Sequence, residues 1–116
     1  MRIYIAGPMR GIEEFNFPAF HAAAARLRAA GHVVFDPAEH DESTGFDATG
    51  LTGHEDLAGL GFDLRAALGA DLAWITSTAE AVCVLGGWAR SKGASAEVCV
   101  AVALGLPVLS LEEAAS

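Results

Sequence analysis

The sequence predicts an α/β domain with a parallel sheet and helices on both faces of that sheet. Short apolar segments of strand length alternate with longer segments in which apolar residues recur every three or four positions. The short segments are apolar throughout, which is typical of strands covered on both faces. The chain has 116 residues, enough for one such domain. We therefore expect a single Rossmann-like (flavodoxin-like) domain over residues 1–116, with about 4–5 strands.

Turn and capping residues place these elements along the chain. The expected strands cover 2–6, 32–36, 80–85 and 107–110, and the expected helices cover 17–30, 62–77 and 94–104. Asn16 is expected to cap the first helix, and Pro37 is expected to end the second strand. The tail from Leu111 is expected to form a helical turn or to fray.

The segment 37–61 is polar, acidic and rich in glycine, and its only expected element is a short helix near 54–60. A loop of this length in a compact domain is usually functional or mobile. His40 and His54 share the segment with acidic side chains, but the usual spacing of metal ligands is absent. We expect no metal and no organic cofactor.

The net charge, the apolar runs and the cysteines of the chain indicate which partners and which cellular compartment to expect. The formal net charge of −8 repels polyanions, so polymeric DNA or RNA is not an expected partner, whereas a small phosphorylated ligand is compatible with a few local donors. No apolar run is long enough to cross a bilayer, and the N-terminal apolar stretch is too short for a signal peptide. Cys83 and Cys99 lie in apolar runs and are expected to be reduced core thiols. We expect a cytoplasmic protein.

Ligands of parallel α/β sheets bind beyond the carboxyl ends of the strands. After the first strand, Gly7 and Gly11 flank Arg10, so the backbone can approach a ligand and the guanidinium can clamp a phosphate. After the third strand, the segment 91–97 leads into a helix whose free N–H groups suit an anion. Arg10 as a solvated side chain at an ordinary strand exit is the competing interpretation.

Three further side chains are candidates for chemistry. Glu97 is the only charged residue between Ala94 and Leu106, Asp71 borders the apolar stripe of its helix, and Tyr4 is the only tyrosine. The alternatives are that Glu97 complements the helix dipole, that Asp71 is a solvated edge residue and that Tyr4 is a core aromatic. If Asp71 and Glu97 converge, two carboxylates around a sugar carbon suit an oxocarbenium-like glycosyl cleavage.

Three segments, in order, resemble the nucleoside 2-deoxyribosyltransferase superfamily. They are Tyr4 to Gly11, Asp71 to Ile75, and Ser91 to Glu97 continued by Ala101 to Val108. Within the superfamily, the chain is most similar to deoxynucleoside 5'-monophosphate N-glycosidases, to CMP hydrolases and to small bacterial and phage domains of unknown function. The resemblance does not cover the acidic segment 37–61, which would shape the base pocket or act as a lid.

The resemblance implies roles for seven residues. Glu97 would be the nucleophile that attacks the anomeric carbon, Asp71 the general acid/base or sugar-positioning group, and Tyr4 the residue that orients the nucleophile. The residues holding the 5' end of the ligand would be Gly7, Arg10, Ser91 and Gly93. Relatives that use free nucleosides typically carry aspartate at the position of Ser91, which would repel a phosphate, so the serine favours a nucleoside 5'-monophosphate.

The expected function is therefore hydrolysis of the N-glycosidic bond of a nucleoside 5'-monophosphate, with release of free base and sugar phosphate. A deoxyribosyltransferase that exchanges bases and a non-catalytic nucleotide-binding or sensing domain stay open as alternatives. A receiver-like signalling domain ranks lower, because such domains need an acidic cluster after the first strand. The base, the sugar and the oligomer size are also open. A homodimer or higher homo-oligomer is expected, with Trp74 and Trp88 either at the interface or in the core.

Overall fold

The computed structural model describes residues 1–116 and contains one four-stranded parallel sheet with strand order β2-β1-β3-β4. The strands are β1 (Arg2–Ala6), β2 (Val33–Phe35), β3 (Ala81–Val84) and β4 (Val108–Ser110). The helices are α1 (Phe17–Ala29), α2 (Pro37–Ser43), α3 (Leu64–Ser77), α4 (Lys92–Ala103) and α5 (Leu111–Ala115), with 3-10 turns η1 (Glu13–Asn16), η2 (Ala58–Leu60) and η3 (Trp88–Arg90). The predicted single Rossmann-like α/β fold is confirmed.

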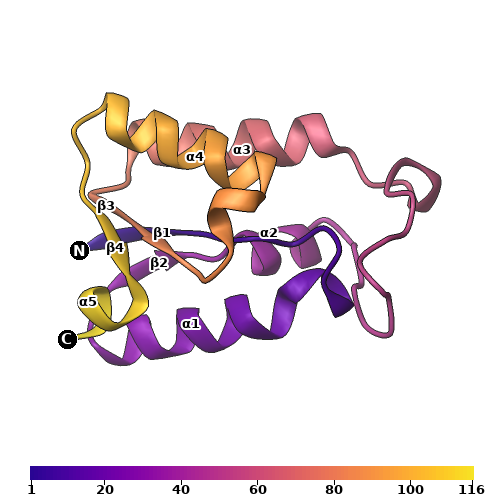
Figure 1. Ribbon diagram of the computed structural model, residues 1–116, viewed down its shortest axis with the longest axis horizontal. Coiled ribbons are helices and arrows are strands. Elements are labelled where there is room, and N and C mark those ends of the chain that lie inside the picture. The colour runs from indigo at the N-terminus through magenta and orange to yellow at the C-terminus, as the bar shows by residue number, and fades with distance from the viewer.

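Helices cover both faces of the sheet, as Figure 1 shows: α3 and α4 lie on one side, and α1 and α5 lie on the other. Successive side chains of β1 alternate between these two layers. Ile3 and Ile5 belong to the core under α1, whereas Tyr4 and Ala6 belong to the core under α3 and α4. All four are fully buried, because β1 is an inner strand with a helical layer on each side. Tyr4 is thereby directed towards α3 and α4.

The prediction that 37–61 lacks structure apart from a short helix near 54–60 is wrong for its first part. Pro37 does not simply end the strand but begins α2, since the proline ring suits the first position of a helix. Asp36 caps this helix by accepting a hydrogen bond from the backbone N–H of Ala38 at 2.9 Å. The short helix predicted near 54–60 is observed as the 3-10 turn η2, which covers only Ala58–Leu60. The remainder extends past the carboxyl ends of the strands, at the right of Figure 1.

Backbone contacts hold this extended segment against the turn after β1. Gly11 N–H donates to the Gly53 carbonyl and Glu14 N–H donates to the Leu51 carbonyl, both at 2.8 Å. Gly53 has a φ of +90°, and a Cβ there would lie 2.1 Å from the carbonyl oxygen of Ile12. Only glycine fits this close approach. The segment is therefore docked on the turn after β1 rather than free in solvent.

Several predicted helix ends are corrected by the caps. Asn16 has a φ of +63° and makes no capping hydrogen bond; its amide donates instead to the Pro8 carbonyl at 2.9 Å. Asp63 caps α3, which therefore starts two residues later than predicted. Ser91 caps α4, which therefore starts at Lys92 rather than residue 94. The tail forms α5 and does not fray, because Ser110 and Glu113 make a capping box.

The two cysteines differ in their environment. Cys83 is a buried thiol, as predicted, and burial raises its pKa to about 11. Cys99 is exposed, so the prediction of a second core thiol is wrong. The residue lies in an apolar run of α4, but helical geometry turns its side chain to the outer face. None of the helices combines the length and the apolar character that crossing a bilayer requires.

Candidate functional site

A cavity of about 710 Å³ lies among the loops at the carboxyl ends of the strands. All seven residues proposed from the sequence line it: Tyr4, Gly7, Arg10, Asp71, Ser91, Gly93 and Glu97. They come from β1 and the turn after it, from α3, and from the start of α4. The fold thus brings together three segments that are far apart in the sequence.

Tyr4 and Glu97 form a buried hydrogen bond at the cavity wall. The Tyr4 hydroxyl donates to Glu97 Oε2 at 2.6 Å, which joins β1 to the second turn of α4. The Tyr4 ring is held by Phe35, with ring centroids 5.5 Å apart, and by Trp74 at 6.5 Å. Burial and the charge of Glu97 raise the pKa of Tyr4 well above its usual value, so the phenol stays a hydrogen-bond donor. This contact fixes Oε2 of Glu97 and leaves the other carboxyl oxygen of Glu97 available for a further contact.

Asp71 approaches the same point from α3. Its side chain is buried, and Oδ1 has no hydrogen-bond partner. A carboxylate oxygen without a donor is costly in a low-dielectric site. The neighbouring Asp71 carboxyl raises the pKa of Glu97, and Glu97 in turn lowers that of Asp71. These directions place the proton of the pair on Glu97 and the negative charge on Asp71.

Burial sets the protonation of this pair. It raises the pKa of Glu97 to about 8, with further increases from the nearby charges of Asp71 and Asp41 and a decrease from the Tyr4 hydrogen bond. Burial also raises the pKa of Asp71 to about 6, against decreases from the neighbouring Tyr4, His40 and Glu97 side chains. The two carboxyl groups therefore share one proton around neutral pH. A group that can give up a proton lies beside one that can attack or accept.

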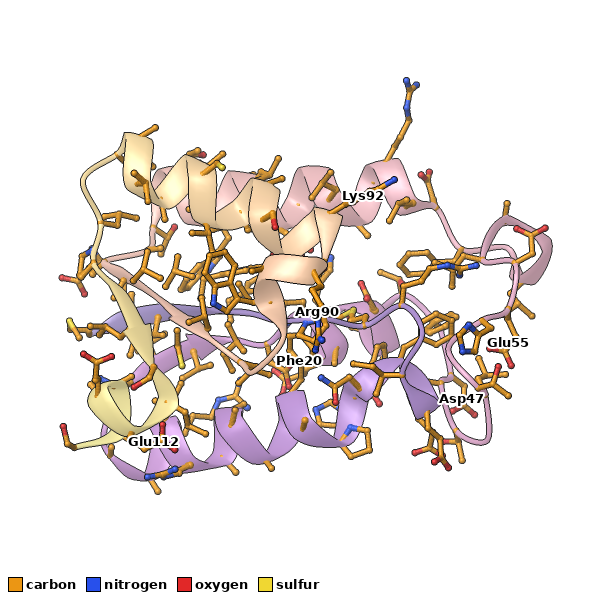
Figure 2. The ribbon with its side chains drawn as sticks, viewed as in Figure 1. Phe20, Asp47, Glu55, Arg90, Lys92 and Glu112 are labelled. Atoms are coloured by element: carbon orange, nitrogen blue, oxygen red, sulfur yellow. The ribbon has the colours of Figure 1, made fainter.

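Ser91 and the start of α4 form the wall beside the carboxyl pair. Ser91 Oγ accepts from the Ala94 N–H at 3.2 Å, which leaves its own O–H free to donate. Arg90 and Lys92 also line the cavity, and neither forms an ion pair within the chain. Figure 2 labels both residues, at the turn that leads into α4. A hydroxyl, a helix N-terminus and two cations thus line this part of the cavity and suit an anion.

The structure changes the account of Arg10 and Gly7. Arg10 lines the cavity, but its guanidinium also donates to the Glu55 carbonyl at 2.6 Å and to the His54 carbonyl at 3.4 Å. Arg10 therefore helps to hold the segment after α2, a role that the sequence analysis did not predict. A Cβ at Gly7 would lie 2.9 Å from Cβ of Leu85. The close approach that requires glycine there is between the ends of β1 and β3.

Sequence reasoning missed much of the cavity wall. Five of the six phenylalanines of the chain line the cavity: Phe15, Phe17, Phe20, Phe46 and Phe62. Asp41 of α2 lines it as well. Phe17 and Phe20 lie in the helix expected over 17–30 and Asp41 lies in the acidic segment 37–61, and none of the three was proposed as a site residue. The Asp36-Pro37 helix start was the signal available for Asp41, because it places Asp41 on the same helix face as Pro37.

Two further expectations bear on the site. Trp74 packs on Phe35 with ring centroids 5.3 Å apart and, like Trp88, is partly buried against the core under α3 and α4. This supports the core interpretation of both tryptophans. No group of three or more His, Cys, Asp or Glu side chains is arranged to hold a metal ion. His40 and His54 do not form such a group with the acids of 37–61.

Fold and cavity define a parallel α/β protein with a ligand cavity at the carboxyl end of its sheet, walled by a buried carboxyl pair, two free cations and aromatic rings. The chain belongs to the family described as "Domain of unknown function (DUF4406)", whose model matches residues 1–110. No curated protein matches it.

Proposed function

We propose that this protein hydrolyses the N-glycosidic bond of a nucleoside 5'-monophosphate and releases the free base and a sugar phosphate. The observation that carries the proposal is the Tyr4–Glu97 contact of 2.6 Å beside the unpartnered Oδ1 of Asp71, inside a cavity of about 710 Å³. The resemblance of three segments to the nucleoside 2-deoxyribosyltransferase superfamily supports the same reaction. The arrangement supplies a nucleophile and a proton carrier at one point.

In the first step, Glu97 in its ionised form attacks the anomeric carbon of the bound nucleotide. The bond between that carbon and the base nitrogen breaks, and its electron pair leaves with the base. When the nucleotide binds, the proton of the pair passes from Glu97 to Asp71, and Asp71 donates it to the leaving base. The positive charge that develops on the sugar stabilises ionised Glu97 and offsets the burial that raises its pKa. The Tyr4 hydroxyl holds the attacking carboxylate in place.

In the second step, water attacks the anomeric carbon of the glycosyl-Glu97 ester. Asp71 removes a proton from this water, the bond between sugar and carboxylate breaks, and Glu97 is regenerated. The carboxyl pair ends with the single proton that it held at the start, so the cycle balances. If a second base occupied the cavity in place of water, the same intermediate would yield a transferase.

The phosphate of the ligand is proposed to lie against Ser91, Gly93 and the N-terminus of α4. The Ser91 hydroxyl and the free N–H groups there donate to phosphate oxygens. The side chains of Arg90 and Lys92 add positive charge, since neither is engaged in an ion pair. The cavity thereby attracts a phosphate locally although the formal net charge of the chain is −8.

A chromatographic assay for free base tests the proposal. Purified protein is mixed with each common ribo- and deoxyribonucleoside 5'-monophosphate and with the matching nucleosides, and a second base is added to half the samples. Release of base from a monophosphate without added base supports the hydrolase. Formation of a new nucleoside or nucleotide only with added base identifies a transferase. Binding of nucleotides without any release contradicts the reaction and identifies a binding domain.

Replacing Ser91 by aspartate is expected to lower kcat/KM for monophosphates by roughly 100-fold and to leave free nucleosides unaffected or improved. Aspartate is as good a helix cap as serine, so α4 should keep its stability. The added charge, however, repels a phosphate at the α4 N-terminus. Parallel rates on a monophosphate and its nucleoside measure the effect, and thermal unfolding checks the cap. An equal loss on both substrates would refute the placement of the phosphate.

We also propose that the protein is cytoplasmic and acts as a homodimer or higher homo-oligomer. Val102 and Leu104, at the end of α4, and Leu64, at the start of α3, are exposed apolar side chains that an interface would cover. Sedimentation of the purified chain measures the oligomeric state.

A further inference from the structure

Asp41 is a buried carboxyl that the proposed reaction does not use. Its side chain is on α2 and the residue is only 5% exposed. Its backbone carbonyl accepts hydrogen bonds from the N–H groups of Thr44 at 3.1 Å and Phe46 at 3.2 Å, whereas its carboxyl group makes no hydrogen bond within the chain. A buried carboxyl without a partner destabilises the empty protein. A ligand that hydrogen-bonds to it would remove that cost.

The position of Asp41 indicates which part of a ligand it meets. It lies where the main cavity joins a smaller one of about 300 Å³, and the two share Asp41, Phe46, Phe62 and Ala67 in their walls. The rings of Phe46 and Phe62 have centroids 5.0 Å apart. One polar group beside two aromatic rings matches a nucleobase, which offers an aromatic face and a hydrogen-bonding edge.

We propose that Asp41, Phe46 and Phe62 form the subsite that holds the nucleobase, with the Asp41 carboxyl hydrogen-bonded to a base edge that carries a donor beside an acceptor. This inference rests on the nucleotide ligand of the proposed function. It assigns the base to α2 and the segment between α2 and α3, which contain none of the seven residues predicted from the sequence.

The surroundings of Asp41 favour its neutral form. Burial raises its pKa to about 7, and the charges of Asp71, Asp36 and Glu42 raise it further. The titratable groups around it are Asp36 and Glu42 at the two ends of α2, Asp71 from α3 and Glu97 from α4, and His40 and Asp63, which line the smaller cavity with it. A neutral carboxyl presents one O–H donor beside one acceptor. That pattern complements an edge such as a ring nitrogen beside an amino group.

Asparagine and leucine distinguish this role from a structural one. Asparagine at position 41 offers a donor beside an acceptor at every pH, whereas leucine of similar size offers neither. Both variants are made in a Glu97→Gln background, which blocks turnover. Calorimetry then measures binding of the ribo- and deoxyribonucleoside 5'-monophosphates and of the base-free sugar phosphates at pH 6. Asp56→Leu serves as the matched control, because Asp56 lies in the same segment and lines neither cavity.

Asp41→Leu is expected to weaken binding of the preferred mononucleotide by roughly 10- to 100-fold, and that of ribose 5-phosphate or its deoxy analogue by less than about twofold. Asp41→Asn is expected to bind within about threefold of the parent at pH 6 and to keep that affinity at pH 8.5, where the parent loses it. Equal loss of nucleotide and sugar phosphate, or no loss, overturns the inference and leaves the hydrolase standing. The expected pattern without any base release supports the subsite and contradicts the hydrolase. If no nucleotide binds the parent, both fail.

Discussion

Replacing Glu97 by glutamine is expected to lower base release from the best monophosphate by roughly 10³- to 10⁶-fold. The amide cannot form the glycosyl ester through which the proposed reaction passes. It can still accept the hydrogen bond that Tyr4 now donates to Glu97 Oε2 at 2.6 Å, so the cavity should keep its shape. Initial rates of base release measure turnover, and calorimetry measures binding of the same nucleotide. Turnover should be lost while binding is retained.

Glu112→Gln is the matched control for this prediction. Glu112 is an exposed residue of α5, at the end of the molecule opposite to Asp47 and Glu55 (Figure 2). Its substitution should change the rate by less than about twofold, since surface changes away from a site have small effects. A Glu97→Gln protein that kept more than about a tenth of the parent's rate would show that another group attacks the sugar. Loss of nucleotide binding together with turnover would instead indicate a collapsed cavity.

The stability of the folded chain is expected to fall as the pH rises from 5 to 9, and Glu97→Gln is expected to remove a large part of that fall. The pKa of Glu97 is about 8 in the folded chain, against an ordinary value of 4.5. Between these values the folded state holds a proton that the unfolded state has released. Its stabilising contribution is therefore complete below pH 4.5 and is lost as the pH passes 8.

The expected difference is about 4 kcal/mol at pH 9, with the variant more stable than the parent, relative to close to zero at pH 5. Denaturant unfolding at pH 5, 7 and 9 measures it. Burial lowers the pKa of His21, but hydrogen bonds with Asp36 and Glu42 outweigh it and raise that pKa. The contribution of His21 to the stability of the folded chain is therefore also lost as the pH rises. This contribution is common to both proteins and cancels in their difference. Parallel stability curves for parent and variant would mean that Glu97 is not held protonated by burial.

Carboxylates whose pKa is lowered in the folded chain change its stability in a different, more acid pH range. Hydrogen bonds from Arg28 lower the pKa of Glu39, and backbone N–H groups lower those of Glu55 and Glu113. Their contributions are present above about pH 4.5 and are lost at more acid pH. The fall between pH 5 and 9 therefore reports the buried cavity acids Asp41, Asp71 and Glu97, together with His21. A buried acid cluster that destabilises the empty protein is typical of a functional site.

Residues with a strong local preference were correctly predicted from the sequence. The apolar runs of β1 and β3 fix inner strands, and the helical spacing of Phe17, Phe20, Ala24 and Leu27 fixes α1. The order of strands and helices then leaves the parallel sheet as the arrangement that buries them. Because parallel strands end at the same edge, the ligand was expected beyond the carboxyl ends of the strands, and the cavity lined by Tyr4 and Glu97 lies there.

Only the tertiary structure decided the features that depend on neighbours distant in sequence. The cap that Asp36 provides at the start of α2 is a local signal. The sequence interpretation nevertheless took Pro37 as the end of a strand, and the structure shows it as the first residue of the helix. Asn16 makes its hydrogen bond to Pro8, and Arg10 makes its hydrogen bonds to the segment around His54. Asp41 looks like any other acid in a polar segment until α2 packs and buries it. Burial is a property of the whole fold, so no window of sequence contains it.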